Sequence, residues 1–333
     1  MTAVRRGIGF TTMHTRDEII ECAILADELG YHVVAVPEAW GYDATLLLTE
    51  IALNTKQIRP MSCIVSIWGR TPATLAMNSA TLLDISDGRY ILGLGVSTPA
   101  IVDGFHDRPF RRPVSEMERV LAEVRNLMAG GRATITHETD ERPLRLGLSV
   151  SHELDIVVAG MGPRLRRLAA LEADGWAPVF LSREYASAQL DEIRRVRADA
   201  GLADEPFLPI LPPGVTVDPD VEGARAAAAS NLAFYITAMG DNYSRLITEQ
   251  GYGDEVEAVL AANPRPKPGQ CVVPDELTRL WDDFLQVVPP EEAHDALAPW
   301  DDLGGVISVS PPPMTSKERM LDVVRAAAPL TAT

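Results

Sequence analysis

The hydrophobic pattern of this chain alternates between short apolar runs and longer segments in which apolar residues recur every three or four positions. Apolar runs of four to seven residues predict β-strands, and the helical spacing predicts amphipathic helices between them. The runs that predict strands are residues 4–10, 32–37, 61–67, 90–94, 155–159, 176–181, a stretch within 207–217, and 306–309. This alternation indicates a parallel sheet, because consecutive parallel strands need a long crossover between them.

Residues 59–97 show the repeating unit most clearly, as strand, helix and strand. Thr71 is a good N-cap for the helix, and Pro72 suits its first position because the missing N–H costs nothing there. In parallel α/β proteins, ligands bind at the carboxyl ends of the strands. Two stretches therefore become candidate binding positions, Ser66-Ile67-Trp68 and Gly95-Val96-Ser97.

Capping residues predict where three further helices begin. Thr15 with Glu18 forms a capping-box pattern, and Ser115 with Glu118 repeats it. Ser316 is the expected start of the last helix.

Eight strands with helices between them predict a (β/α)8 TIM barrel with insertions, and we expect a single domain over residues 1–333. A doubly wound open sheet is the alternative. The insertions are expected near 98–113, 131–153 and 218–300. The first reads as a long loop, the second has weak β character that predicts a hairpin, and the third shows helical patterns without a convincing strand.

Composition narrows the classes of function. The formal net charge of −17 argues against binding to nucleic acid or to anionic membrane surfaces. No apolar run approaches the roughly 20 residues that span a bilayer, and the amino terminus leads straight into a strand, so we expect a soluble cytoplasmic protein. Cys22 and Cys63 lie within apolar patterns and are expected to be buried, unreactive thiols.

The barrel prediction places a set of side chains at the carboxyl ends of the strands. Each also has a structural interpretation: Glu38 as a helix cap, Trp68 as part of the core, and His14 or His106 as solvated loop residues. The set is His14, Glu38, Trp40, Ser66, Ile67, Trp68, Ser97, His106, Met161 and Gly162.

The segment Gly160-Met161-Gly162-Pro163 predicts an anion site, because it places free backbone N–H groups at a helix amino terminus directly after a strand. Arg164 adds positive charge in the first turn, where the helix dipole disfavours a cation. The alternative is a tight turn that needs glycine.

Other chemistries lack their sequence patterns. We find no phosphate-binding P-loop and no dinucleotide fingerprint after the first strand. The six histidines show no metal-binding spacing, and the three cysteines form no CxxC pair, so a metal site is not expected. Hydrolysis by paired carboxylates stays open, but nothing singles out a pair.

Four separated segments, in order, carry a resemblance to a known family. They are LADELGYHVVAVPEAWGYDATLLLTEIALNT, RTPATLAMNSATLLDISDGRYILGLGVS, AGMGPRLRRLAALEADGW and LAFYITAMGDNYSRLITEQGYGDEV. Residues 4–260 resemble the bacterial luciferase-like superfamily, and most of all its branch that uses the deazaflavin coenzyme F420. The last 70 residues match weakly. The family fold is a (β/α)8 barrel with insertions.

The resemblance implies roles for particular residues. A non-prolyl cis peptide is implied at Ser66-Ile67, against the middle ring of the cofactor. The turn from Gly160 to Arg164 would bind the cofactor phosphate. Glu38 would lie near the pyrimidine end of the ring, and Gly95 and Ser97 near the cofactor side chain.

The chain departs from several relatives at one position, where Ala39 replaces a functional histidine after strand two. The proton donor or acceptor must then come from elsewhere, or none is needed. Among the candidates for donor we rank His106 first, ahead of His14 and Glu38. The first hypothesis is an F420-dependent oxidoreductase that moves hydride between the deazaflavin and a small, apolar or conjugated substrate. The alternatives are an FMN-dependent monooxygenase and a non-catalytic flavin-binding protein. The resemblance also implies a homodimer.

Overall fold

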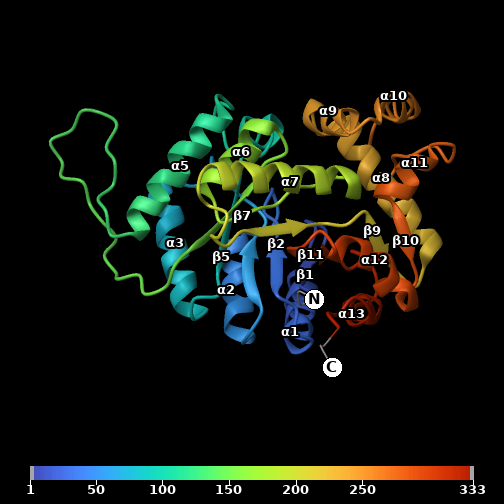
Figure 1. Cartoon of the computed structure of the whole chain (residues 1–333), viewed down its shortest axis with the longest axis horizontal. Coiled ribbons are helices and arrows are strands. Elements are labelled where there is room, and N and C mark those ends of the chain that lie inside the picture. The colour runs from blue at the N-terminus through green and yellow to red at the C-terminus, as the bar shows by residue number, and fades with distance from the viewer. Residues whose placement is uncertain (1–3, 331–333) are drawn as a thin grey trace.

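The computed structural model describes residues 4–330 and shows a closed barrel of parallel strands surrounded by helices (Figure 1). The barrel strands are β1 (Arg6–Gly9), β2 (Val33–Val36), β3 (Arg59–Ser62) with β4 (Val65–Ser66), β5 (Ile91–Gly95), β6 (Asp155–Ala159), β7 (Gly175–Trp176), β8 (Leu208–Leu211) and β11 (Val306–Val309). The ring closes because β5 pairs with both β3 and β4, while β1 pairs with β2 and β11. This closure confirms the barrel and excludes the open sheet.

Helices form the outer layer, and their starts follow local capping chemistry. They include α1 (Arg16–Glu28), α2 (Ala44–Asn54), α3 (Pro72–Ile85), α5 (Pro113–Met128), α6 (Pro163–Glu172), α7 (Arg183–Asp199), α12 (Ala293–Asp301) and α13 (Lys317–Ala326). The predicted caps at Thr15, Thr71 and Ser316 are confirmed. Helix α5 instead begins at Pro113, two residues before the predicted Ser115 start, because proline suits the first helical turn.

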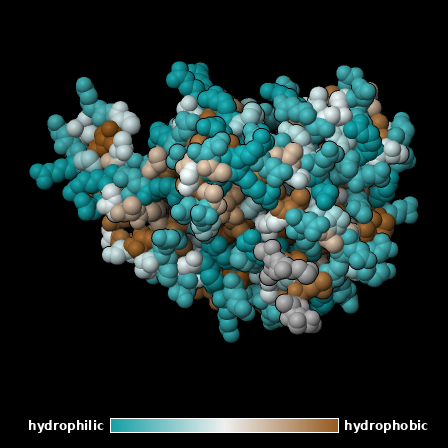
Figure 2. All heavy atoms as spheres, viewed as in Figure 1, coloured by the Kyte–Doolittle hydropathy of each residue, from teal (hydrophilic) through white to brown (hydrophobic). Residues whose placement is uncertain are grey.

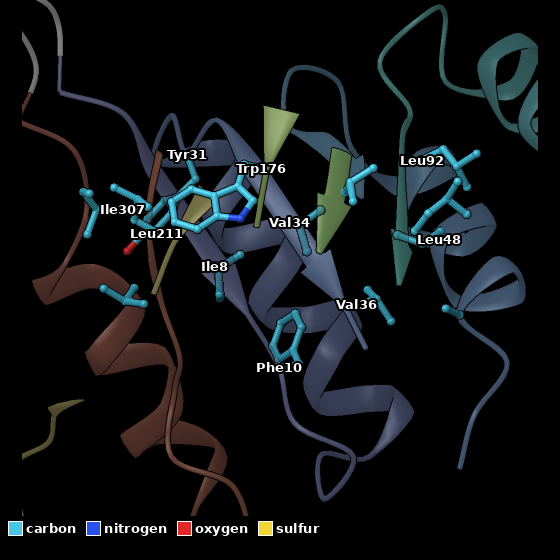
Figure 3. Close-up of a cluster of buried hydrophobic side chains, with 14 of the residues drawn as sticks. Ile8, Phe10, Tyr31, Val34, Val36, Leu48, Leu92, Trp176, Leu211 and Ile307 are labelled. Atoms are coloured by element: carbon cyan, nitrogen blue, oxygen red, sulfur yellow. The ribbon is translucent and has the colours of Figure 1, made fainter. Parts of the chain in front are cut away.

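The alternation of strand side chains creates two apolar layers. Val33, Ala35 and Met61 belong to a cluster inside the barrel, with residues of β5, β6, β8 and β11. Val34 and Val36 point the other way, into the layer between strands and helices, part of which is drawn in Figure 3. Both layers are nearly free of solvent exposure, so the strand ends are held on a rigid frame.

Two predicted strands are interrupted. The strand predicted at 61–67 is divided into β3 and β4, and the stretch within 207–217 is divided into β8 and β9 (Val215–Val217) by Pro212-Pro213-Gly214. Strand β9 leaves the barrel and pairs with β10 (Gln286–Val288). The sequence interpretation missed β10, because three residues carry too short a pattern to detect.

The three insertions take different forms. Residues 98–113 contain the short helix α4 (Pro99–Val102). The hairpin predicted at 131–153 is wrong: residues 129–154 form a projecting loop without strands, closed at its base by the bond from Ala133 N–H to Leu144 O at 2.7 Å (Figure 1). The polar, proline-containing sequence there lacks the alternation that a paired strand needs.

Residues 218–300 contain α8 (Val221–Ala238), α9 (Asp241–Glu249), α10 (Gly253–Ala262), α11 (Thr278–Phe284), β10, the 3-10 helix η1 (Pro290–Glu292) and α12. Helices α8 to α11 share an apolar cluster of their own. Within residues 4–330, no helix is long and apolar enough to cross a membrane.

Candidate functional site

The carboxyl ends of β4 and β5 lie side by side, and they bring the two predicted binding stretches together. Ile67 is buried, and its N–H donates to Gly95 O at 3.1 Å. The Trp68 indole donates to Val96 O at 3.0 Å, and its backbone N–H donates to the hydroxyl of the buried Ser66 at 3.3 Å. Candidates that are 28 residues apart in sequence therefore form one wall.

The cis peptide lies elsewhere than the resemblance implied. It joins Cys63 and Ile64, in the break between β3 and β4, and not Ser66 and Ile67. The prediction was wrong because nothing in an apolar run marks which of its peptide bonds is reversed. The break places Ile64 against Gly95: a Cβ at Gly95 would lie 2.4 Å from Ile64 Cδ1, so only glycine fits there.

The two cysteines that were expected to be unreactive lie in α1 (Cys22) and in the break between β3 and β4 (Cys63). Burial raises the pKa of Cys63 to about 11 and that of Cys22 to about 12, which fits the expectation of unreactive thiols. Ser97 is half-buried and holds a left-handed backbone with φ of 59°. That conformation is uncommon for a serine and directs the chain away from the strand end.

His106 lies over the loop that follows β4. A Cβ added to Gly69 would be only 3.0 Å from His106 Cε1, so the imidazole rests directly on the Gly69 backbone. The ring of Phe105 meets the imidazole edge-on at 5.3 Å between centroids, and Trp68 lies 5.9 Å from Phe110. The long loop thus carries a half-buried histidine to the end of β4.

Glu38 follows β2 and is paired with a residue that the sequence interpretation missed. Its carboxylate forms a two-pronged ion pair with Arg70, in which Arg70 Nη2 lies 2.7 Å from Glu38 Oε2. It also accepts the Ala44 N–H at 3.0 Å. Arg70 reaches a third group, Asp43 Oδ2, at 2.7 Å. No periodic signal marks Arg70, which stands in a polar loop directly after a glycine.

His14 is enclosed by backbone partners. Its side chain is buried; the Thr11 N–H donates to Nδ1 at 3.0 Å, and Nε2 donates to Pro311 O at 3.1 Å in that tautomer. Burial lowers the pKa of His14, against weaker opposing effects of those backbone bonds. Both ring nitrogens are therefore occupied, and this arrangement favours a structural role. A small cavity beside it is lined also by Ala39 and Tyr42.

The glycine turn after β6 is built as an open helix terminus. A Cβ at Gly160 would lie 2.5 Å from Leu165 Cβ, so the turn approaches α6 closely. Gly162 is the exposed N-cap, no side chain caps it, and Pro163 occupies the first helical position. Met161 is half-buried, and its carbonyl accepts from Arg166 Nη1 at 3.2 Å. The first turn of α6 is left for an anionic ligand or water.

Arg164 does not point clearly to this turn. It is exposed and lines a groove on the outside of the barrel between α5 and α6, together with Leu121 and Leu168. No contact of Arg164 therefore supports its predicted role at the anion site, whereas the backbone of the turn does fit an anion.

The fold and this arrangement define a luciferase-like barrel, and the comparisons agree. The sequence model of the luciferase-like monooxygenase family matches residues 1–305, so the chain belongs to that family. The resemblance found in the four sequence segments is thereby confirmed.

Two named relatives and one solved structure resemble this chain along most of their length. A provisionally named coenzyme F420-dependent oxidoreductase of Mycobacterium tuberculosis is 29% identical, over 87% of this chain and 89% of that protein. A phthiodiolone/phenolphthiodiolone dimycocerosates ketoreductase of Mycobacterium kansasii is 28% identical, over 83% and 78%. The coenzyme F420-dependent tetrahydromethanopterin reductase from Methanopyrus kandleri superposes with a TM-score of 0.78 at 19% identity, over 97% of each chain. That likeness concerns the fold.

Proposed function

We propose that this protein is an F420-dependent oxidoreductase that transfers hydride between the deazaflavin and a small, apolar or conjugated organic substrate. The observation that carries the proposal is the open amino terminus of α6, where Gly162 caps the helix without a side chain directly after a barrel strand. Such a terminus suits a cofactor phosphate. The names of the relatives supply the choice of F420, and FMN is the alternative cofactor.

The proposed cofactor contacts come from three strand ends. Gly160, Met161, Gly162 and Pro163 would hold the phosphate, with Arg164 at the edge of that turn. Ser66, Ile67 and Trp68 would support the ring from strand three, and Gly95 and Ser97 would face its side chain. Glu38 would accept a hydrogen bond from the ring. The bound deazaflavin supplies the hydride chemistry, and the protein supplies orientation and a proton.

His106 is the proposed proton donor. Reduction of a double bond leaves an anion that must be protonated, and histidine is the commonest general acid in enzymes. Among the three candidates, His14 is enclosed by backbone and Glu38 is held by Arg70. His106 is half-buried beside Gly69 and Phe105, on a loop that is able to close over a substrate.

An apolar or conjugated substrate is supported by aromatic side chains on the same side of the barrel. Trp68 and Phe110 are half-buried neighbours, whereas Trp40 and Phe105 are 58% and 61% exposed. Exposed aromatic rings around a strand-end site favour stacking against a planar or apolar ligand.

We also propose a homodimer. Leu46 and Leu53 lie seven residues apart on α2 and are 72% and 69% exposed, and Met77 on the neighbouring α3 is 57% exposed. Figure 2 shows hydrophobic residues gathered on this face around the position of α3. Exposed apolar residues on adjacent helices are typical of a surface that a second copy covers.

The proposal is tested by titrating the purified protein with F420 and, separately, with FMN, while following fluorescence. We expect micromolar binding of F420 and much weaker binding of FMN. Turnover of reduced F420 with a series of ketones and conjugated carbonyl compounds then tests the reaction. Micromolar affinity for FMN with none for F420 would overturn the choice of cofactor, and F420 binding without any turnover would favour a carrier protein.

A further inference from the structure

Three charged side chains lie together in the loops that follow β2 and β4. The guanidinium of Arg70 is 12% exposed and the carboxylate of Glu38 is 14% exposed, while Asp43 at 45% closes the group from the solvent side. Arg70 bonds both oxygens of Glu38, and its Nη2 is 2.7 Å from Asp43 Oδ2. Two of the three charges are therefore largely withdrawn from water.

These contacts join two loops that come from different strands. Glu38 and Asp43 belong to the connection from β2 to α2, where Asp43 also caps α2 by accepting the Thr45 N–H at 2.8 Å. Arg70 belongs to the connection from β4 to α3, one residue after the Gly69 on which His106 rests. The guanidinium of Arg70 thus links Glu38, which follows β2, to the loop that carries Gly69 and supports His106.

Stability alone does not account for such a group. Moving charges out of water carries a free-energy cost that roughly offsets their attraction, so a buried pair is weak evidence of stabilisation. A guanidinium that binds both oxygens of a carboxylate does fix that carboxylate in direction, because its N–H groups form a rigid fork. The geometry is therefore suited to orientation.

We propose that Arg70 is a positioning residue of the cofactor site: it holds Glu38 as a fixed, ionised hydrogen-bond acceptor and holds the Gly69 backbone under His106. The inference rests on the proposed function for its cofactor, but its structural half does not. It assigns Glu38 to hydrogen-bond acceptance and removes it from the candidates for proton donor.

Other titratable groups face this network and limit the design of a test. The charges of Arg70 and Glu38 act on the buried phenol of Tyr90. Burial raises the pKa of Tyr90 to about 12, so the phenol stays neutral below pH 9. Asp43 is the second carboxylate, and His106 lies on the adjoining Gly69. Measurements at a single pH of 7.5 therefore compare the variants with Tyr90 neutral throughout.

The test is a double-mutant cycle on F420 affinity with Arg70→Met, Glu38→Gln and the double variant. Alone, Arg70→Met should weaken F420 binding about tenfold or more, because Glu38 loses the fork that fixes the direction of its carboxylate. In the Glu38→Gln background the same change should cost less than about threefold. Arg70→Lys should recover part of the loss, since an ammonium replaces the charge but not the fork.

Arg59→Met is the matched control, because Arg59 forms an ion pair with Asp155 at 2.6 Å at the opposite, amino-terminal end of the barrel. This variant should leave the affinity for F420 unchanged. Equal losses from Arg70→Met in both backgrounds would show that Arg70 acts on the cofactor directly and would overturn the proposal.

A second measurement does not depend on the cofactor. Hydrogen exchange of the unliganded protein should accelerate in residues 66–71 and 104–110 for Arg70→Met, and not for Arg59→Met. Unchanged exchange in those segments would overturn the positioning role. If wild-type protein binds no F420 while exchange responds as expected, the proposed function fails and the structural role of Arg70 stands.

Discussion

At the scale of single residues, a substitution in the glycine turn after β6 should affect ligand binding without weakening the fold. Gly162→Asp should weaken cofactor binding strongly, because a carboxylate would face the phosphate. The same change should leave thermal stability unchanged or slightly higher, since aspartate is a better N-cap than glycine and a Cβ there meets no atom within 4 Å. Fluorescence titration and thermal unfolding check both halves; unaltered affinity would remove this turn from the site.

The role of His106 is a second prediction at this scale. His106→Ala should leave F420 affinity nearly intact and slow single-turnover hydride transfer about 100-fold or more, the usual contribution of a general acid. His152→Ala is the control, because His152 is a half-buried histidine that lies against Gly88 at the other end of the barrel. A loss of affinity with no loss of rate would assign His106 to loop ordering.

The sequence predicted most residues of the candidate site and missed others for identifiable reasons. Glu38, Trp68 and the turn at Gly160 were predicted because they follow apolar runs, and strand ends are where a barrel places its ligands. Arg70 was missed because its importance lies in a partner 32 residues away, which no local pattern reveals. The cis peptide was misplaced by three residues for a similar reason: no local pattern marks the break between β3 and β4, where Ile64 packs on Gly95.

At the scale of elements, the start of β2 makes stability depend on pH. Burial, followed by the charges of Arg5 and Arg59, lowers the pKa of His32 to about 4. Between pH 6.5 and 4 the unfolded chain therefore binds a proton that the folded chain excludes, so the free energy of unfolding falls as pH falls through this window. His14 acts in the same direction.

His32→Gln should reduce that slope without changing the stability greatly at pH 7.5, where both states hold a neutral side chain. Urea unfolding at pH 7.5 and at pH 5.5 measures the difference. A slope equal to that of the wild type would show that other groups cause the acid sensitivity.

A further element-scale prediction concerns the connection from α2 to β3. Burial alone would raise the pKa of Asp27, but the backbone N–H groups of Ile58, Lys56 and Gln57 donate to its carboxylate and lower the pKa. Asp27→Asn should cost about 2 kcal/mol of unfolding free energy, because bonds to a charged acceptor weaken and one N–H loses its partner. Chemical unfolding measures this loss. Asp17→Asn, at an exposed position of α1, is the control and should leave the free energy of unfolding unchanged.

At the scale of the whole molecule, the net charge and the exposed apolar face on α2 and α3 together bear on assembly. With a formal charge of −17, two copies repel each other at long range, so a dimer needs a contact that excludes water. Leu46→Glu combined with Met77→Glu should convert the proposed dimer to a monomer, because both residues are more than half exposed on that face.

Light scattering after size exclusion at micromolar concentration measures the state. Leu260→Glu, on the exposed side of α10, is the control and should leave the dimer intact. Wild-type protein that is already monomeric would contradict the proposal.

The pairing of β1 with β11 has a consequence for how the chain can be connected. The first and last strands are neighbours in the ring, and α13 returns beside α1, where the Tyr31 hydroxyl donates to Val324 O at 2.7 Å (Figure 1). A closed ring has no intrinsic first strand, so the order of synthesis and the order of closure are separable. A circularly permuted gene that opens the projecting loop and links residue 330 to residue 4 preserves every strand pairing, and its product should form the same barrel.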